Sequence, residues 1–328
     1  MDTHKLFSDF NSIICLNDSK ISKLKSNRKA LRIKIRDHFK EKEWGAPKFY
    51  SQGSFSLNTN LNPIKKFSED GDIKEEYDLD DGVYFICSVS ERKEPATYHD
   101  RIKKAVEGHT VEGVTDKTTC VRVVYSDGHH IDLPSYWLEN DGDIPQLTHK
   151  SKGFTDSDPK EFKDWVEKKI TDASGNGQLL RIIRYLKGWK DYREDKNSSL
   201  NLPSGFILTI LACNHFSKNS RDDLSFKETV KAINTELDSQ FTCYRPTTPT
   251  DEELLAKFSK DTVMNELNNI LKNAQSAIDS DCEKESSEFW RNVFGDRFPL
   301  GKESDDDDNQ SRVLKSERTK VSAPWTSC

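Results

Sequence analysis

The sequence lacks the features of several large classes of protein. No uninterrupted apolar stretch approaches the roughly 20 residues that a bilayer-spanning helix needs, and residues 1–11 show no basic segment followed by an apolar one. The seven cysteines are scattered and form no Cys-x-x-Cys pair, which argues against a zinc or redox motif of that type. We therefore expect a cytoplasmic protein with reduced thiols and no membrane partner.

The chain also has no excess of positive charge. It carries 50 Lys and Arg against 56 Asp and Glu, which gives a formal net charge of −6. This balance argues against a grip on nucleic acid by the whole surface, so any anion site must be local. With 328 residues, 17 Phe and 6 Trp, the chain can fill two modest cores, and two lobes are the default expectation.

The first half of the chain combines one long helix with short strands. Residues 20–42 carry ten Lys or Arg, and their apolar residues recur at spacings of four and seven, which predicts a basic amphipathic helix. Solvated lysines on an outer face are the commoner reading of such a helix, and a nucleic-acid groove is the alternative. After Pro47 we predict strands at 83–89, 120–125 and 130–138, the last two joined as a hairpin through Ser126-Asp127-Gly128.

From about Pro159 onward the pattern is helical. Apolar periodicity predicts helices over 162–170, 179–192, 206–216 and 226–237, and a further one that begins at a capping box, Thr250-x-x-Glu253. Beyond Gly301 the chain is polar and contains an Asp305–Asp308 run, which predicts a mobile tail.

The strongest chemical signal is Asp78-Leu79-Asp80, which leads directly into an apolar strand. In an extended chain, residues i and i+2 point to one face with Cα atoms roughly 6.6 Å apart, so the two carboxylates can share a site. Alone, Asp-x-Asp is more often a solvated turn than a metal site. An EF-hand calcium loop is excluded, because the glycine comes too early and no closing Glu follows.

Two further elements accompany these carboxylates. Gln52-Gly53-Ser54 is a small turn whose backbone N–H groups and hydroxyl can approach a triphosphate, although alone it reads as an ordinary turn. Asp132 lies between apolar neighbours on the return strand of the hairpin, where a carboxylate is costly without a partner and a cation is the natural one. A Gly-Ser turn, Asp-x-Asp and a distal Asp together form the signature of the DNA polymerase β nucleotidyltransferase superfamily.

Within that superfamily, the chain resembles the bacterial cGAS/DncV-like nucleotidyltransferases (CD-NTases), which make cyclic oligonucleotide signals in antiphage (CBASS) defence. The resemblance runs from about residue 46 to residue 300. The segments that carry it are QGSF at 52–55, EYDLDDGVY at 76–84, HIDLPSY at 130–136, SDPKEFKDW at 157–165, YLKGWKD at 185–191, LPSG at 202–205 and WRNVFGDRFP at 290–299.

The resemblance implies an α+β, bilobal polymerase β-like fold. A mixed β-sheet catalytic lobe with a long N-terminal spine helix would occupy residues 1–160. A helical-bundle lobe that completes the nucleotide cleft would occupy 161–300, and a flexible tail 301–328.

The resemblance also implies roles for individual residues. Asp78, Asp80 and Asp132 match the catalytic carboxylates that bind two Mg²⁺ ions, for which Mn²⁺ can substitute. Gly53 and Ser54, with the preceding Gln52, match the turn that holds the donor triphosphate.

Four other positions match residues that contact the nucleotide. Lys187 and Ser204 match groups of the second lobe that reach the β- and γ-phosphates. Arg122 matches a basic residue of the active site and Tyr136 an aromatic that stacks on a base; a surface cation and a core tyrosine are the ordinary alternatives. Leu57 stands where a vibrio-type family member has an aromatic stacker, so the resemblance leaves the choice of bases open.

The function implied is the Mg²⁺-dependent joining of NTPs, such as ATP or GTP, into a cyclic di- or trinucleotide messenger with release of pyrophosphate. A downstream effector that the messenger activates is an implied partner. A ubiquitin-transfer-like accessory protein that acts on the C-terminus at Cys328 is a further one, with a tail of no role as the alternative.

Three other functions stay open at this point. Within the superfamily they are a linear oligonucleotide synthetase and an enzyme that transfers AMP to a protein. A non-catalytic nucleic-acid sensor that uses the basic helix 20–42 is the alternative of another class, although three carboxylates in a phosphate path repel nucleic acid unless metal is present.

Overall fold

The computed structural model describes residues 1–67, 73–173 and 177–303. One half of the molecule is a mixed sheet with strand order β1-β4-β7-β6-β5, extended by β8 and β9. The strands are β1 (Lys48–Gln52), β4 (Asp78–Ile86), β5 (Val114–Asp116), β6 (Cys120–Val124), β7 (His130–Leu138), β8 (Gln146–His149) and β9 (Gly153–Asp156), and a separate pair is formed by β2 (Lys66–Phe67) and β3 (Ile73–Lys74). The strands β4 and β7 run parallel, while β6 pairs with β7 antiparallel. The predicted hairpin and mixed sheet are confirmed.

Alternation along the central strands gives the sheet two different faces. In β4, Leu79 and Val83 are fully buried in one core cluster. Because successive side chains of a strand point to opposite faces, Asp78, Asp80 and Tyr84 lie on the other face. The sheet therefore has an apolar face and a face that carries carboxylates.

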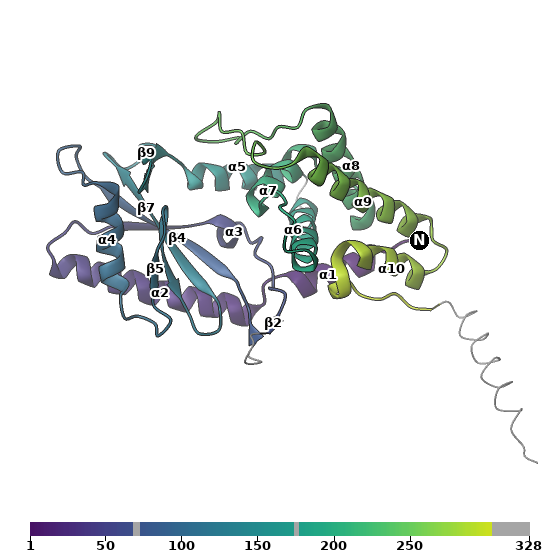
Figure 1. Cartoon of the computed structure of the whole chain (residues 1–328), viewed down its shortest axis with the longest axis horizontal. Coiled ribbons are helices and arrows are strands. Elements are labelled where there is room, and N and C mark those ends of the chain that lie inside the picture. Colours follow the sequence, from purple (N-terminus) through teal and green to yellow (C-terminus); the bar gives the residue numbers. More distant parts are fainter. Residues whose placement is uncertain (68–72, 174–176, 304–328) are drawn as a thin grey trace, which may run out of the picture.

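The helix α2 (Asp18–Glu41) covers the apolar face together with α4 (Pro95–Val106). Its buried residues, Leu24, Leu31, Ile35 and Phe39, follow the predicted spacing, and Figure 1 shows it running the length of the strand-bearing half. Two of its nine Lys and Arg side chains, Arg28 and Arg32, bond side chains of the sheet. Arg32 donates from Nε to Asp81 Oδ2 at 2.6 Å, and Arg28 bonds Ser51, so both serve the packing of helix on sheet.

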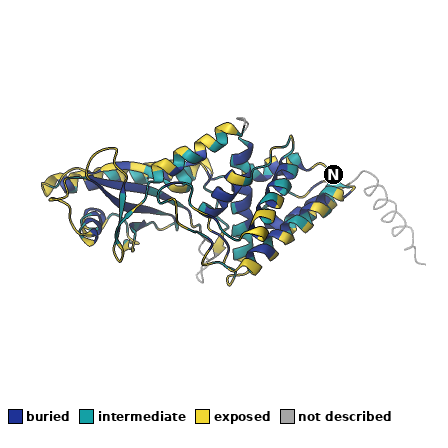
Figure 2. Cartoon of the chain, turned by 90° about the horizontal axis from the view of Figure 1, so that it is seen from above, coloured by how far each residue is buried: buried dark blue, intermediate teal, exposed yellow. Residues whose placement is uncertain are grey.

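The other half of the molecule is helical. It consists of α5 (Pro159–Asp172), α6 (Gln178–Lys196), α7 (Gly205–His215), α8 (Asp222–Ser239), α9 (Lys260–Asp279), α10 (Glu283–Phe294) and the 3₁₀ turn η1 (Gly295–Arg297). Figure 2 shows their buried sides turned inward and their exposed sides outward. This half matches the predicted bundle, including a large buried cluster around Trp189, Phe226 and Trp290.

The predicted capping box at Thr250-x-x-Glu253 is wrong. The helix α9 begins ten residues later, where the Ser259 side chain accepts a hydrogen bond from Thr262 N. Glu253 instead accepts from the backbone N–H groups of Cys243 (3.0 Å) and Leu255 (2.8 Å). Its carboxylate therefore holds a loop closed and is not available to cap a helix.

The first helix, α1 (His4–Ile14), packs with the helical half. Phe7 and Phe10 are fully buried in the same cluster as Trp290. The division of the chain at 160/161 stays a prediction, to which this packing adds that α1 shares its core with residues beyond 161. The predicted tail lies outside the described residues from position 304 on, as does Cys328.

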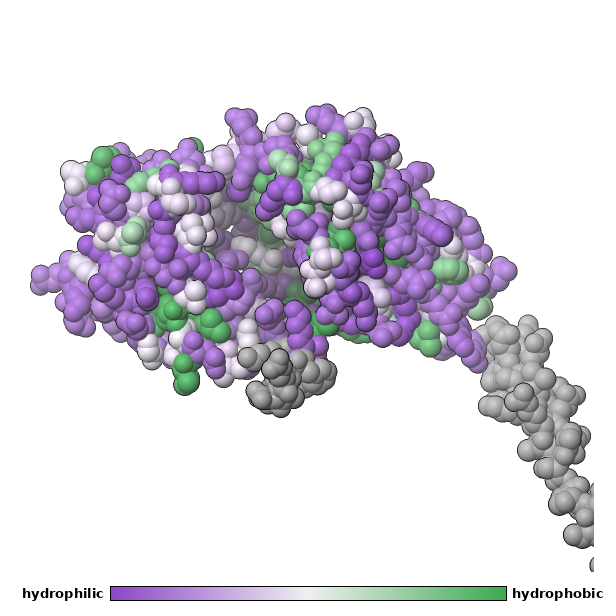
Figure 3. Space-filling view, viewed as in Figure 1, coloured by the Kyte–Doolittle hydropathy of each residue, from purple (hydrophilic) through white to green (hydrophobic). Residues whose placement is uncertain are grey.

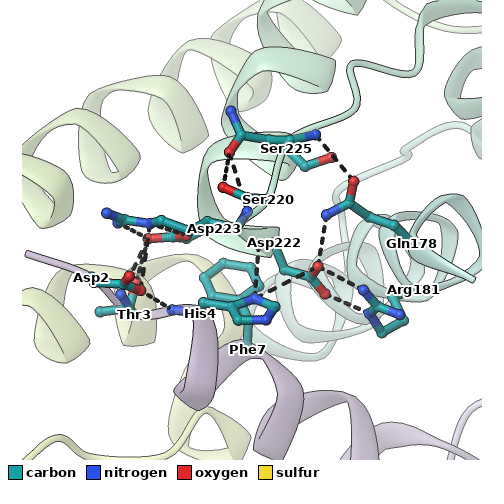
Figure 4. A network of polar contacts seen from close by, with 12 residues as sticks. Asp2, Thr3, His4, Phe7, Gln178, Arg181, Ser220, Asp222, Asp223 and Ser225 are labelled. Carbon is teal, nitrogen blue, oxygen red and sulfur yellow. Dashed lines mark hydrogen bonds and ion pairs between the residues drawn. The ribbon is translucent and has the colours of Figure 1, made fainter. Parts of the chain in front are cut away.

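A buried polar network fastens α1 to α6 and α8 (Figure 4). The Asp222 carboxylate accepts from Arg181 at 2.6 and 2.8 Å, from Tyr185 OH at 2.9 Å and from Gln178 Nε2 at 2.9 Å. The neighbouring Asp223 accepts from both the backbone N–H and the hydroxyl of Thr3. Both carboxylates are fully buried, and their partners lower the pKa of each against the effect of burial.

Among the helices in the described ranges, none has both the length and the apolar composition needed to span a membrane.

We predict that Asp222→Ala lowers the free energy of unfolding by about 3–5 kcal/mol, the usual cost of removing one partner from a buried ion pair. Urea unfolding followed by circular dichroism measures it. Asp172→Ala is the matched control, because its side chain is 58% exposed and pairs with Lys168, so its loss should cost less than about 1 kcal/mol. Equal effects of the two variants would contradict a structural role for this network.

Candidate functional site

Two carboxylates come from the start of β4. Asp78 and Asp80 lie two residues apart on the same strand, so both point away from the α2 core. The Asp78 side chain is 43% exposed, and Asp80 is half-buried. Burial, followed by the charges of Asp78 and Asp132, raises the pKa of Asp80 well above its usual range. The charges of Arg122 and Lys187 offset these effects only in part.

The third predicted carboxylate, Asp132, comes from β7 and is paired with Asp80 in the parallel register. Its residue is 8% exposed. Arg122, the predicted basic residue, lies opposite Asp132 on β6. It donates from Nε to Oδ1 at 2.7 Å and from Nη2 to Oδ2 at 2.6 Å. The structure therefore brings the carboxylates of both strands to one face, and the most buried of them, Asp132, is paired with an arginine.

The predicted Gly53-Ser54 turn lies directly against Asp80. The strand β1 pairs with β4 so that Gln52 is opposite Asp80, and the short helix α3 (Gly53–Ser56) follows. Gly53 has φ of +65°, and a Cβ at this position would overlap Asp80 Oδ2. Only glycine allows both this backbone conformation and the close approach.

Lys187 joins the helical half to this turn. From α6 its Nζ donates to Ser54 Oγ at 2.7 Å, to Thr59 O at 2.9 Å and to Thr59 Oγ1 at 3.2 Å. One helical turn earlier, Arg184 donates to Asn58 O at 2.7 Å. Burial lowers the pKa of Lys187 to about 8, an effect that the carboxylates of Asp191, Asp78 and Asp80 oppose.

Ser204 and Tyr136, the other two residues predicted to contact the nucleotide, have different surroundings from Lys187 and Arg122. Ser204 is exposed and caps α7, since its hydroxyl accepts from Ile207 N at 3.4 Å; it is the next residue, Gly205, that packs against Lys187. Tyr136 is 3% exposed and stacks on Tyr84 with ring centroids 4.6 Å apart. Its role in stacking on a base stays a prediction.

Five of the predicted site residues line a cavity of about 320 Å³ between the two halves, where the space-filling surface is hollowed (Figure 3). The strand-bearing half supplies the Gln52–Ser54 turn, Asp80 and Tyr136, and the helical half supplies residues of α5, of α7 and of the loop between α8 and α9. The lining residues are Gln52, Gly53, Ser54, Ser56, Leu57, Thr59, Asp80, Tyr136, Ser157, Pro159, Phe162, Lys163, Gly205, Phe206, Thr209 and Arg245.

Asp78 and Asp80 fit a divalent cation. They are adjacent oxygen donors of the kind that Mg²⁺ prefers, and Asn60, whose Nδ2 donates to Asp78 O, has an Oδ1 that is buried with no hydrogen-bond partner among the described residues. The same is true of Nε2 of His130, which lies 4.0 Å from Asp78 Oδ2. Asp132 fits less directly, because both of its oxygens accept from Arg122. Within the described ranges, no group of three or more His, Cys, Asp or Glu is arranged to hold a metal.

Sequence reasoning missed Thr59, Asn60, Phe206 and Arg245. The first two follow the Gly-Ser turn closely, and that proximity was the one signal that could have suggested them. Phe206 follows the quoted LPSG segment closely, and that proximity could have suggested it. Nothing near Arg245 in the sequence indicates that it lines the same cavity as the turn, because its position depends on how the helical half packs.

Comparison with known proteins relates the chain to one family. The family described as "Cyclic GMP-AMP synthase DncV-like, nucleotidyltransferase domain" matches residues 47–136. A cyclic GMP-AMP synthase of Escherichia albertii is 26% identical over 258 residues, which are 77% of this chain and 56% of that protein. One of Vibrio cholerae is 23% identical over 245 residues, covering 60% and 53%. The chain thus spans about half the length of the curated relatives it matches.

Solved structures share the fold. The Vibrio cholerae DncV cyclic AMP-GMP synthase in complex with nonhydrolyzable GTP superposes with a TM-score of 0.76 at 19% identity, covering 92% of this chain and 100% of that one. The apo form of DncV gives 0.75 at 20% identity, covering 91% and 96%. The predicted bilobal α+β fold is confirmed.

The lowered pKa of Lys187 predicts how pH affects nucleotide affinity. If Lys187 binds a phosphate of the nucleotide, as we predict, the protonated amine makes that contact. The proton is lost as pH rises through about 8, so affinity for a nonhydrolysable NTP should fall above that pH. In the folded protein this amine gives up its proton more readily than in the unfolded chain. Its contribution to stability therefore increases with pH between about 8 and its unfolded pKa of about 10.4.

Isothermal titration calorimetry from about pH 6.5 to about 9.5 tests this prediction. Lys187→Arg, whose guanidinium stays charged across this range, should flatten the decline. Lys168→Met removes an amine that is 73% exposed and should leave the wild-type profile unchanged. A wild-type profile that is flat across pH 8 would contradict the assignment.

Proposed function

We propose that this chain, whose residues 47–136 match the DncV-like nucleotidyltransferase family, is a Mg²⁺-dependent enzyme that joins NTPs into a cyclic di- or trinucleotide and releases pyrophosphate. The observation that carries the proposal is the register of Asp80 with Asp132, beside the Gly53-Ser54 turn, at a cavity formed by both halves. Two relatives named as cyclic GMP-AMP synthases support a cyclic product.

In this proposal the protein acts mainly by positioning. The Gly53-Ser54 turn and Lys187 hold the triphosphate of the donor, with Lys187 already fixed by Ser54 and Thr59 before the nucleotide arrives. A ribose hydroxyl of the acceptor then attacks the α-phosphorus in line, its proton leaves, and the bond to pyrophosphate breaks. A second transfer on the linear intermediate closes the ring.

Asp78 and Asp80 are the residues that would hold Mg²⁺, with Asp132 as a further ligand once its oxygens are released from Arg122. The metal would supply charge neutralisation on the triphosphate and a lower pKa for the acceptor hydroxyl. Once released from Asp132, the Arg122 guanidinium would be free to bind a phosphate beside the carboxylates. A guanidinium binds carboxylate and phosphate groups through the same paired N–H donors.

The cavity also suits the alternatives of the same superfamily, a linear oligonucleotide synthetase and a protein AMP-transferase. Product mass and resistance to phosphatase separate them, because only a ring lacks both a terminal phosphate and a terminal hydroxyl. The nucleic-acid sensor has less support, because Arg28 and Arg32 of the basic helix are bonded to Ser51 and Asp81.

The cellular role that we propose follows the family. The cyclic product would act in the bacterial cytoplasm as an antiphage signal and activate a downstream effector. An accessory protein of the ubiquitin-transfer type would act at Cys328, which lies outside the described residues. Co-expression with such a protein, followed by intact-mass analysis, tests that part.

The double variant Asp78→Asn with Asp80→Asn tests the catalytic assignment. Removing one preorganised charge-stabilising group typically costs roughly 10²–10³ in rate, so the loss of both carboxylates should take the product below detection. The assay follows phosphatase-resistant product from α-labelled NTPs with Mg²⁺, by chromatography and mass spectrometry.

The matched control is Asp141→Asn with Asp143→Asn. These residues form another Asp-x-Asp sequence in the same half, and they line a different cavity. This control should retain wild-type product. Undiminished product from the Asp78/Asp80 variant would refute the assignment.

A further inference from the structure

Arg245 enters the nucleotide cavity from the loop between α8 and α9. The loop lies against the start of α5, where Thr248 N donates to Glu161 Oε2 at 2.9 Å. The Arg245 guanidinium lies over the ring of Phe206 at the start of α7, 5.0 Å from its centroid. Both side chains line the cavity that also contains Ser54 and Asp80. Arg245 therefore reaches the cavity from the α5–α7 side, whereas Lys187 of α6 contacts Ser54 of its lining.

The Arg245 side chain is held in place on its own loop. Glu252 Oε2 accepts from Arg245 Nε at 2.7 Å and lies 2.7 Å from Nη2. The backbone repeats the pairing, because Arg245 N donates to Glu252 O at 3.0 Å and Leu254 N to Cys243 O at 2.8 Å. A guanidinium fixed on a ring and a carboxylate is preorganised, so little side-chain entropy is lost when it binds a ligand.

One edge of this guanidinium remains for a ligand. Nε and Nη2 face Glu252, no hydrogen bond from Nη1 is found among the described residues, and the side chain is 21% exposed. The carboxylate of Glu252 compensates the positive charge, which weakens attraction to a phosphate. A neutral group with two acceptors on one edge suits the remaining Nη1 and Nη2 protons better.

We propose that Arg245 recognises the base of one substrate nucleotide and selects guanine. The proposal rests on the proposed function, since it concerns a nucleotide in the same cavity. Guanine presents O6 and N7 on one edge, and both accept from an arginine fork. Adenine presents its N6 amino group in place of O6, so donor would meet donor. Phe206 and Leu57 add apolar surface for the base.

The test measures binding of nonhydrolysable GTP and ATP analogues by calorimetry, without turnover. Arg245→Gln and Arg245→Lys should each weaken binding of the GTP analogue by roughly ten- to a hundred-fold, which is the discrimination that one bidentate contact provides. Neither should weaken the ATP analogue by more than about twofold, and that retained affinity shows that each variant is folded. Glu252→Gln, which loosens the arginine, should reduce the GTP preference in part.

Arg193→Gln is the matched control, because Arg193 forms a similar pair with Glu266 in the same half, at 2.7 and 2.8 Å, and does not line the cavity. It should leave both affinities unchanged. Equal weakening of both analogues by the Arg245 variants, no effect on either, or a wild-type protein without GTP preference would each overturn the proposal. Because binding alone is measured, a wild-type protein that selects GTP but makes no product would refute the proposed function and leave this inference standing.

Discussion

The arrangement of the site depends on the alternation of side chains along β4. Leu79 and Val83 fill the core beneath α2, and this packing obliges Asp78 and Asp80 to face the opposite side of the sheet. A slip of one residue in register would bury both carboxylates in an apolar core and expose the leucine, a change too costly for the fold to tolerate. The hydrophobic core therefore determines where the charged groups lie.

The same constraint places the carboxylates close together, where burial and mutual repulsion disfavour their charged forms. Asp80 is desolvated and has Asp78 and Asp132 as neighbours, and each of these factors raises its pKa. Arg122 and Lys187 offset part of this cost from two different elements. A site with closely spaced carboxylates and only partial compensation favours cations and cation-bound phosphates over free anions.

The parts of the structure that depend on local periodicity were predictable from the sequence. The basic helix, the hairpin of β6 and β7 and the shared face of Asp78 and Asp80 all follow from spacing along the chain. The register of Asp80 with Asp132 was not predictable from periodicity, because the spacing of residues within each strand does not determine how the two strands pair. Arg245 and Phe206 come near Asp80 only through packing of the helical half. The Thr250-x-x-Glu253 pattern predicted a helix start wrongly, because a carboxylate can accept backbone hydrogen bonds in a loop as readily as at a helix end.

The helix α6 connects the two halves of the molecule through its side chains. Lys187 and Arg184 lie on this one rigid helix, and they hold Ser54, Thr59 and Asn58 on the segment that follows β1. A rotation of the helical half relative to the sheet would strain these bonds and so reshape the turn, and a ligand that displaced the amine of Lys187 would weaken this contact between the halves. Interdomain angle and occupancy of the turn are thereby thermodynamically linked, each changing the equilibrium of the other by the same amount.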